Sequence, residues 1–155
     1  MAKKMAIIAT KGTLDMAYPP FILGSTAAAL GYDVQIFFTF YGLQLLKKDL
    51  SDVKISPLAN PAMPMPIPMP VMVQMLPGME SMATMMMKQK LAKHGVASLE
   101  ELRDLCLEAD VKFVACQMTV DLFEMDKSDF IDNVEYGGAA TFMNFAGDTD
   151  ICLFV

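Results

Sequence analysis

Short apolar runs of strand length alternate with helix-length segments along this chain, and this alternation limits the fold more than any other feature. Runs without polar alternation are typical of strands that are buried on both faces, as in parallel sheets. We therefore expect an α/β fold, with a mainly parallel sheet of about five strands between helices in three α/β/α layers. All 155 residues form one domain in this interpretation. The clearest strand-like runs are Met5–Thr10, Asp33–Thr39, Lys112–Cys116 and Ile151–Val155.

Helices are expected between these runs. The segment Ser98-Leu-Glu-Glu101 is a capping box, in which Glu101 stands three residues after the N-cap, and its helix should extend to about Ala109. An earlier helix should span Asp15–Leu30, because Gly31 supplies a C-terminal stop. The remaining helical or helix-compatible segments are Tyr41–Lys48, Met79–His94, Asp121–Asp126 and a helix opened by Gly137 that extends to about Asn144.

The segment 51–78 interrupts this pattern and is predicted to be an inserted arm. Seven prolines exclude a regular helix or a central strand across most of it, and methionines continue from its second half into the next helix. Methionine packs adaptably, so the arm could offer an apolar surface for self-association or for a partner. Peripheral contact with a membrane and Cu(I) binding by thioethers are less favoured, since the arm lacks a strong basic face and has no clustered Cys or His.

Composition and motifs exclude several classes of protein. The net charge of −6 and the scattered basic residues argue against nucleic-acid binding. The three cysteines form no CxxC pair, which indicates neither a disulfide framework nor a zinc site and favours a cytoplasmic location. No glycine-rich phosphate motif is present, and we expect no metal and no cofactor. The two uncharged runs near the N-terminus are shorter than the roughly 20 apolar residues that span a membrane.

Cys116 is the strongest candidate for chemistry, because it ends a buried strand just before the residues where a helix is expected to begin. Backbone N–H groups at a helix start stabilise a thiolate and lower its pKa. Ligands in parallel α/β folds bind beyond the carboxyl ends of the strands. By this argument the candidate ligand-binding residues are Thr10, Lys11, Gly12, Thr39 and Gln117. Packing in the core is the alternative for Cys116, and a solvated loop is the alternative for Lys11.

The other candidate groups have simpler explanations. Cys106 lies on the apolar stripe of its helix and should pack in the core. Cys152 lies within the last strand, where core packing and a place at the rim both remain open. His94 is the single histidine and stands at a helix end, which suits a capping or surface role better than a Cys–His catalytic pair.

Four segments resemble the DsrE/DsrF-like family, in particular its DsrE-like branch, which was formerly labelled peroxiredoxin-like. The resemblance covers nearly the whole chain, including the Met/Pro-rich insertion. The Lys-Gly-Thr-Leu-Asp and Phe-Phe-Thr-Phe-Tyr-Gly blocks are the most specific, whereas a Thr-x-x-Cys peroxidatic motif is absent. The four segments are Thr10–Pro20, Ile36–Leu43, Pro77–Glu80 and Ala115–Met118.

The resemblance implies a three-layer fold in a homo-oligomer and a role in sulfur relay. Relatives accept a persulfide sulfur on a cysteine and pass it to a small TusA-like carrier, often beside a rhodanese. The family's cysteine corresponds to Cys116, and a second cysteine of this branch corresponds to Cys152. The sequence therefore predicts a sulfurtransferase or sulfur carrier. Two alternatives stay open: an interaction or membrane-docking protein that uses the arm, and a protein that binds a small anion at the strand ends.

Overall fold

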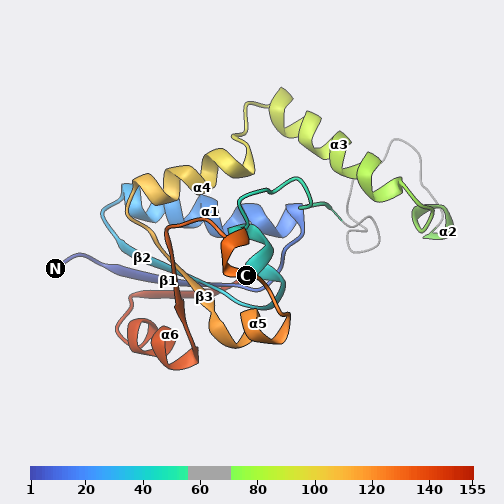
Figure 1. Ribbon diagram of the computed structural model, residues 1–155. Coiled ribbons are helices and arrows are strands. Elements are labelled where there is room, and N and C mark those ends of the chain that lie inside the picture. The colour runs from blue at the N-terminus through green and yellow to red at the C-terminus, as the bar shows by residue number, and fades with distance from the viewer. Residues whose placement is uncertain (56–70) are drawn as a thin grey trace.

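Five parallel strands form a single sheet in the computed structural model, which describes residues 1–55 and 71–155 (Figure 1). Their order across the sheet is β4-β3-β2-β1-β5, so the first strands of the chain lie at the centre. The expected α/β class and parallel sheet are confirmed. The strands are β1 (Lys4–Ala9), β2 (Asp33–Phe38), β3 (Lys112–Cys116), β4 (Val134–Gly137) and β5 (Ile151–Phe154).

Helices cover both faces of the sheet, as a three-layer fold requires. α1 (Leu14–Ala29) and α4 (Leu99–Glu108) lie on one face, whereas α5 (Gln117–Leu122) and α6 (Ala139–Ala146) lie on the other (Figure 1). Successive strand residues alternate between the two cores, so that Ile36 faces α1 while Phe37 packs against Phe142 of α6. The remaining elements are the 3₁₀-helices η1 (Phe40–Leu46) and η2 (Lys127–Asp129), with α2 (Val71–Gln74) and α3 (Met79–Lys93).

Elements with strong local signals form where the sequence predicts them. The Ser98 hydroxyl accepts a hydrogen bond from the Glu101 N–H at 3.2 Å, and the Glu101 carboxylate accepts one from the Ser98 N–H at 2.8 Å. This capping box starts α4, as expected. Gly31 follows α1 with a φ of 86°, a conformation that suits glycine at a helix end.

Elements with weaker signals differ from the prediction. Val134–Gly137 is a strand, so Gly137 ends β4 rather than opening α6. β4 is a half-exposed edge strand and therefore lacks the apolar run that identifies a buried one. α5 begins at Gln117 instead of Asp121, directly after the last residue of β3. The helix expected over Tyr41–Lys48 is the 3₁₀-helix η1, which ends earlier.

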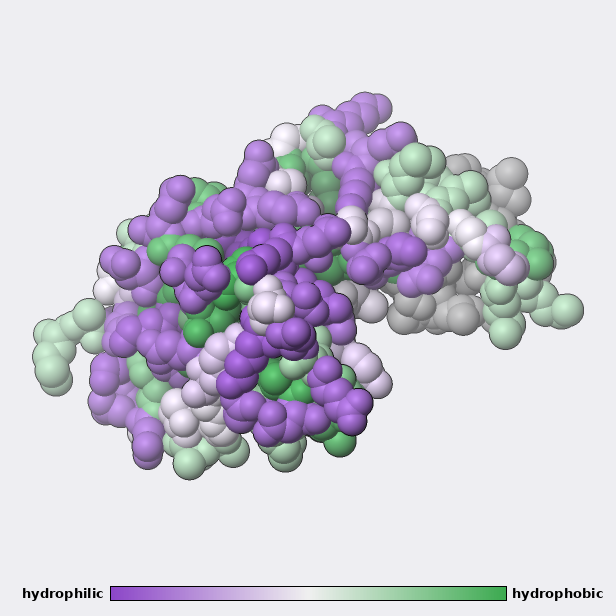
Figure 2. All heavy atoms as spheres, in the orientation of Figure 1, coloured by the Kyte–Doolittle hydropathy of each residue, from purple (hydrophilic) through white to green (hydrophobic). Residues whose placement is uncertain are grey.

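α3 projects away from the sheet and contacts the rest of the domain through few residues (Figure 1). Ala83 and Thr84 are its buried residues, and the Thr84 hydroxyl accepts a hydrogen bond from the Ile55 N–H at 3.0 Å. Figure 2 shows hydrophobic side chains over the outer part of this projection, and Met85 of α3 is exposed. Most of the predicted insertion, residues 56–70, lies outside the described residues. Across the described ranges, no helix has the length and apolar character needed to cross a membrane.

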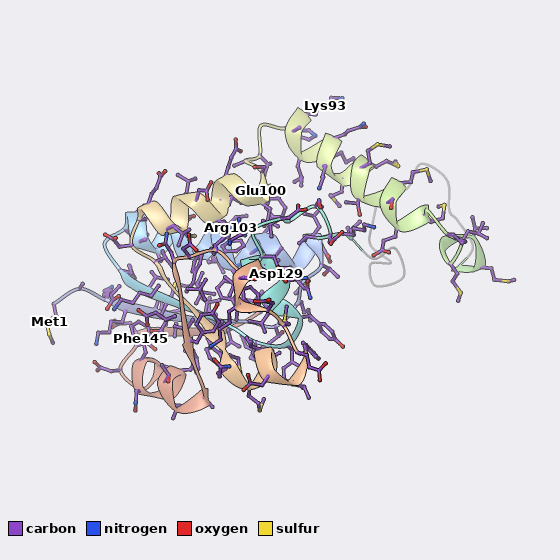
Figure 3. All side chains as sticks on the ribbon, viewed as in Figure 1. Met1, Lys93, Glu100, Arg103, Asp129 and Phe145 are labelled. Atoms are coloured by element: carbon purple, nitrogen blue, oxygen red, sulfur yellow. The ribbon has the colours of Figure 1, made fainter. Side chains whose placement is uncertain are left out.

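The segment after β2 is held tightly against β1 and α4. Gly42 lies so close to the end of β1 that a Cβ there would meet the carbonyl oxygen of Ala9. From the other side, the Arg103 guanidinium of α4 (labelled in Figure 3) donates hydrogen bonds to the carbonyl oxygens of Leu45 at 3.0 Å and Lys47 at 2.6 Å. These contacts fix η1, and with it the residues that follow β2, at the carboxyl edge of the sheet.

The close approach of Gly42 predicts a sharp sensitivity to one added methyl group. Gly42→Ala should lower the free energy of unfolding by about 2–4 kcal/mol, because the neighbouring atom is backbone and cannot rotate away. Gly138→Ala is the matched control, since a Cβ at Gly138 has no neighbour within 4 Å and its φ of −103° is ordinary. Urea denaturation of both variants checks this, and losses of equal size would contradict it.

Candidate functional site

The carboxyl ends of β2 and β3 bring Thr39 beside Cys116. Phe38 pairs with Ala115, and the Thr39 N–H donates to the carbonyl oxygen of Ala9, so the next residue on each strand lies at the same level. The Cys116 side chain faces the α6 side of the sheet and packs with the small core that contains Phe37. Cys116 is buried, with 4% of the residue exposed, and it ends its strand at the carboxyl edge of the sheet.

Thr119 connects these two residues. It is fully buried on α5, and its hydroxyl lies 3.2 Å from the Thr39 hydroxyl. The same hydroxyl oxygen accepts a hydrogen bond from the Phe40 N–H at 3.3 Å. The Phe40 N–H uses one of the two lone pairs of that oxygen, and the Thr119 hydroxyl hydrogen is available for donation to Thr39 or to the Cys116 sulfur.

The surroundings of Cys116 favour its thiolate. Burial raises the pKa of Cys116, but the hydroxyl and N–H of Thr119, the Thr39 hydroxyl and the Met118 N–H together outweigh burial and hold that pKa below its ordinary value. Cys116 is the N-cap residue of α5, although its thiol makes no aligned capping hydrogen bond there. The lowering therefore depends on several weak donors gathered around one sulfur, which we call the thiol cradle: Thr39, Met118 and Thr119.

Cys106 provides a contrast within the same chain. Burial raises its pKa to about 12, against a smaller lowering effect of Ser25. Its thiol donates a hydrogen bond to the Phe21 carbonyl oxygen at 3.3 Å and lies in the main core. As the sequence predicts, packing accounts for Cys106, and two buried cysteines thus have opposite thiolate stability.

The other candidate ligand-binding residues are directed elsewhere. The Thr10 hydroxyl donates to the Val155 carbonyl oxygen at 3.1 Å, which ties β1 to the end of β5. Gly12 packs against the backbone of Tyr41, where a Cβ would not fit. The Gln117 amide donates to the Asp121 carboxylate at 2.7 Å along α5, and Lys11 is exposed. These four residues do not converge on the sulfur, whereas Thr39 does.

Cys152 lies far from Cys116. It is exposed on the edge strand β5 and pairs with Ala6, which stands level with Gln35 and Lys112 on the intervening strands. Three strand spacings and four residues of strand rise therefore separate the two cysteines, a distance of roughly 20 Å. The two sulfurs cannot react with each other within one chain in this arrangement.

Of the thiol cradle, the sequence analysis did not single out Thr119 or the Met118 N–H as site groups. Thr119 stands three residues after the N-cap Cys116, at the position whose N–H points back toward an N-cap side chain. A helix start placed at Gln117 instead of Asp121 would have identified it. Among the described residues, no group of three or more His, Cys, Asp or Glu side chains could hold a metal ion.

Known proteins are similar to this chain over almost its whole length. Residues 1–154 match the model of the DsrE/DsrF/DrsH-like family. A protein of Allochromatium vinosum named "Sulfur carrier protein DsrE2" is 66% identical over 157 aligned positions, which cover 99% of this chain and 98% of that protein. The uncharacterized protein YrkE of Bacillus subtilis is 31% identical, over 99% of this chain and 97% of that one.

One solved structure supports the fold. The crystal structure of the YchN protein from E. coli aligns over 99% of both chains with a TM-score of 0.57. Its sequence identity of 11% is too low to carry more than the architecture. The expected fold family is therefore confirmed by both sequence and structure.

The geometry of the thiol cradle predicts that the Thr119 hydroxyl lowers the pKa of Cys116. Thr119→Val keeps the shape and the backbone N–H but removes the hydroxyl, so the effect of burial is less opposed and the pKa of Cys116 should rise. The pH dependence of Cys116 alkylation by iodoacetamide measures this pKa. Thr119→Ser, which keeps the hydroxyl, is the control and should retain the low pKa; an unchanged alkylation profile in Thr119→Val would rule out the hydroxyl as the cause.

Proposed function

This chain belongs to the DsrE/DsrF/DrsH-like family, and on that basis we propose that it is a sulfur carrier that holds persulfide sulfur on Cys116. The observation that carries the assignment is the thiol cradle, which favours the thiolate of a cysteine at the carboxyl edge of the sheet. Thiolates are the reactive form in sulfur exchange. The 66% identity with a protein named as a sulfur carrier supports the same role.

The proposed reaction consists of two balanced exchanges. The Cys116 thiolate attacks the terminal sulfur of a donor persulfide, a new sulfur–sulfur bond forms on Cys116, and the donor leaves as a thiolate. An acceptor thiolate then attacks the terminal sulfur of the Cys116 persulfide and regenerates the Cys116 thiolate. Each step breaks one sulfur–sulfur bond and forms another, so no external oxidant or reductant is needed. The thiol cradle stabilises the negative sulfur at the start and the end of the cycle.

Donor and acceptor proteins complete the proposal. A rhodanese-like protein would supply the sulfur and a TusA-like protein would receive it, so the chain would act as a carrier or sulfurtransferase between them.

The three free cysteines are compatible with a reducing cytoplasm, which we propose as its location. Exposed methionines on α3 support assembly into a homo-oligomer.

Any role of Cys152 must differ from that of Cys116, because the two cysteines lie far apart. Its exposure on β5 and its distance from Cys116 exclude an internal resolving cysteine in this arrangement. If Cys152 takes part, it does so by exchanging sulfur with another molecule. Binding of a small anion at the rim is less favoured, because the hydroxyl of Thr10 and the amide of Gln117 are used in other hydrogen bonds.

Loading by polysulfide tests the assignment directly. Wild-type protein treated with sodium polysulfide should gain the mass of one sulfur atom on the peptide that contains Cys116, as measured by mass spectrometry. Cys116→Ser should lose this gain. Cys152→Ser is the matched control and should load Cys116 as wild type does. Loading of Cys116→Ser at the wild-type rate, with the sulfur on another cysteine, would show that Cys116 is not the carrier.

A further inference from the structure

Exposed aromatic rings adjoin the thiol cradle. The ring of Phe123, at the end of α5, stacks on Tyr41 with centroids 5.8 Å apart and meets Phe40 edge-on at 6.3 Å. These three side chains are between 39% and 64% exposed, although they lie within one connected cluster. Together with two exposed neighbours on α5 they form a surface that we call the aromatic rim: Phe40, Tyr41, Met118, Leu122 and Phe123.

The aromatic rim is held in a fixed position relative to the Cys116 sulfur. Phe40 adopts a φ of 49°, which is strained for a residue with a side chain, and its N–H donates to the Thr119 hydroxyl of the thiol cradle. The tight contact of Gly42 with β1 holds the same turn from the other side. The rim is therefore preorganised, which lowers the entropic cost of binding a partner there.

Charge on the α5 side of the rim is negative. Asp121 and Glu124 flank Phe123 in the sequence, and both are exposed. Lys11 is also exposed and precedes Gly12, which packs against Tyr41. The carboxylates on the α5 side repel anionic lipid headgroups and nucleic-acid phosphates and attract a positively charged protein surface.

We propose that the aromatic rim is the docking surface for a protein that presents its reacting thiol or persulfide from an apolar, positively charged surface. This inference rests on the proposed sulfur-carrier function. Aromatic residues supply much of the binding energy at protein interfaces, and the charges around them steer the encounter. Cys116 is 4% exposed, and the aromatic rim adjoins its thiol cradle through the Phe40 N–H and Thr119, so the surface of a partner that presents its thiol to Cys116 would lie against the rings.

Sulfur transfer to designed peptides tests this specificity. The protein is loaded with polysulfide, and transfer from Cys116 is then followed to three acceptors: a cysteine peptide rich in lysine and leucine, the same peptide with glutamate in place of lysine, and glutathione. We expect the lysine peptide to react at least about fivefold faster than the glutamate peptide, and the difference to shrink as salt is added. Equal rates for the two peptides would overturn the proposal.

Variants of the rim separate docking from loading. Phe123→Ala should slow transfer to the lysine peptide several-fold without changing transfer to glutathione or loading by polysulfide. The isosteric double variant Asp121→Asn, Glu124→Gln should remove the preference for lysine over glutamate, and it decides the question if Phe123→Ala does not fold. Unchanged peptide transfer in a folded Phe123→Ala protein would overturn the proposal.

The loading step and the peptide preference test the proposed function and the aromatic rim separately. Failure of the wild-type protein to load Cys116 would reject the proposed function itself, whereas normal loading without peptide preference would reject the aromatic rim alone. Light scattering of Phe123→Ala tests whether a second copy of this chain occupies the rim. A smaller particle with unchanged peptide transfer would assign the rim to contacts between copies and overturn its role in partner docking.

Discussion

The contact between Gly42 and the end of β1 governs the geometry of the site. It leaves no room for a side chain and holds the turn that follows β2 against the sheet. Thr39 is thereby kept level with Cys116, and the Phe40 N–H reaches the buried Thr119 hydroxyl. A backbone contact on β1 thus determines which donors surround a sulfur on β3, two strands away across the sheet.

Two cysteines of the same chain show how far surroundings determine thiol chemistry. Cys106 and Cys116 are both buried. At Cys106, burial raises the thiol pKa with only a smaller opposing effect of Ser25, whereas at Cys116 the donors of Thr39 and Thr119 outweigh burial and lower the pKa. Position at the end of a parallel strand supplies these donors, because the chain turns there and exposes N–H groups and hydroxyls of the next helix. A core position and a stabilised thiolate are therefore compatible in this fold.

The sequence was sufficient wherever the signal is local. The apolar runs of β1 to β3 and the capping box at Ser98 predict their elements closely. β4 escaped prediction because an edge strand that is half exposed has no continuous apolar run. At the site, strand ends predict which residues share a level but not where each side chain points. Thr39 therefore lies beside Cys116, whereas Thr10 and Gln117 turn to other partners, and Thr119 could be identified only from the true start of α5.

Because α3 buries few residues, it should unfold locally at a lower free energy than the central strands of the sheet. Of its 15 residues, only Ala83 and Thr84 are buried, whereas β1 to β3 lie between two layers of helices. Amide hydrogens of α3 can therefore exchange with solvent through local unfolding that leaves the sheet intact. Those of the central strands exchange only when the whole domain opens. α3 can therefore open locally without disturbing the donors around Cys116.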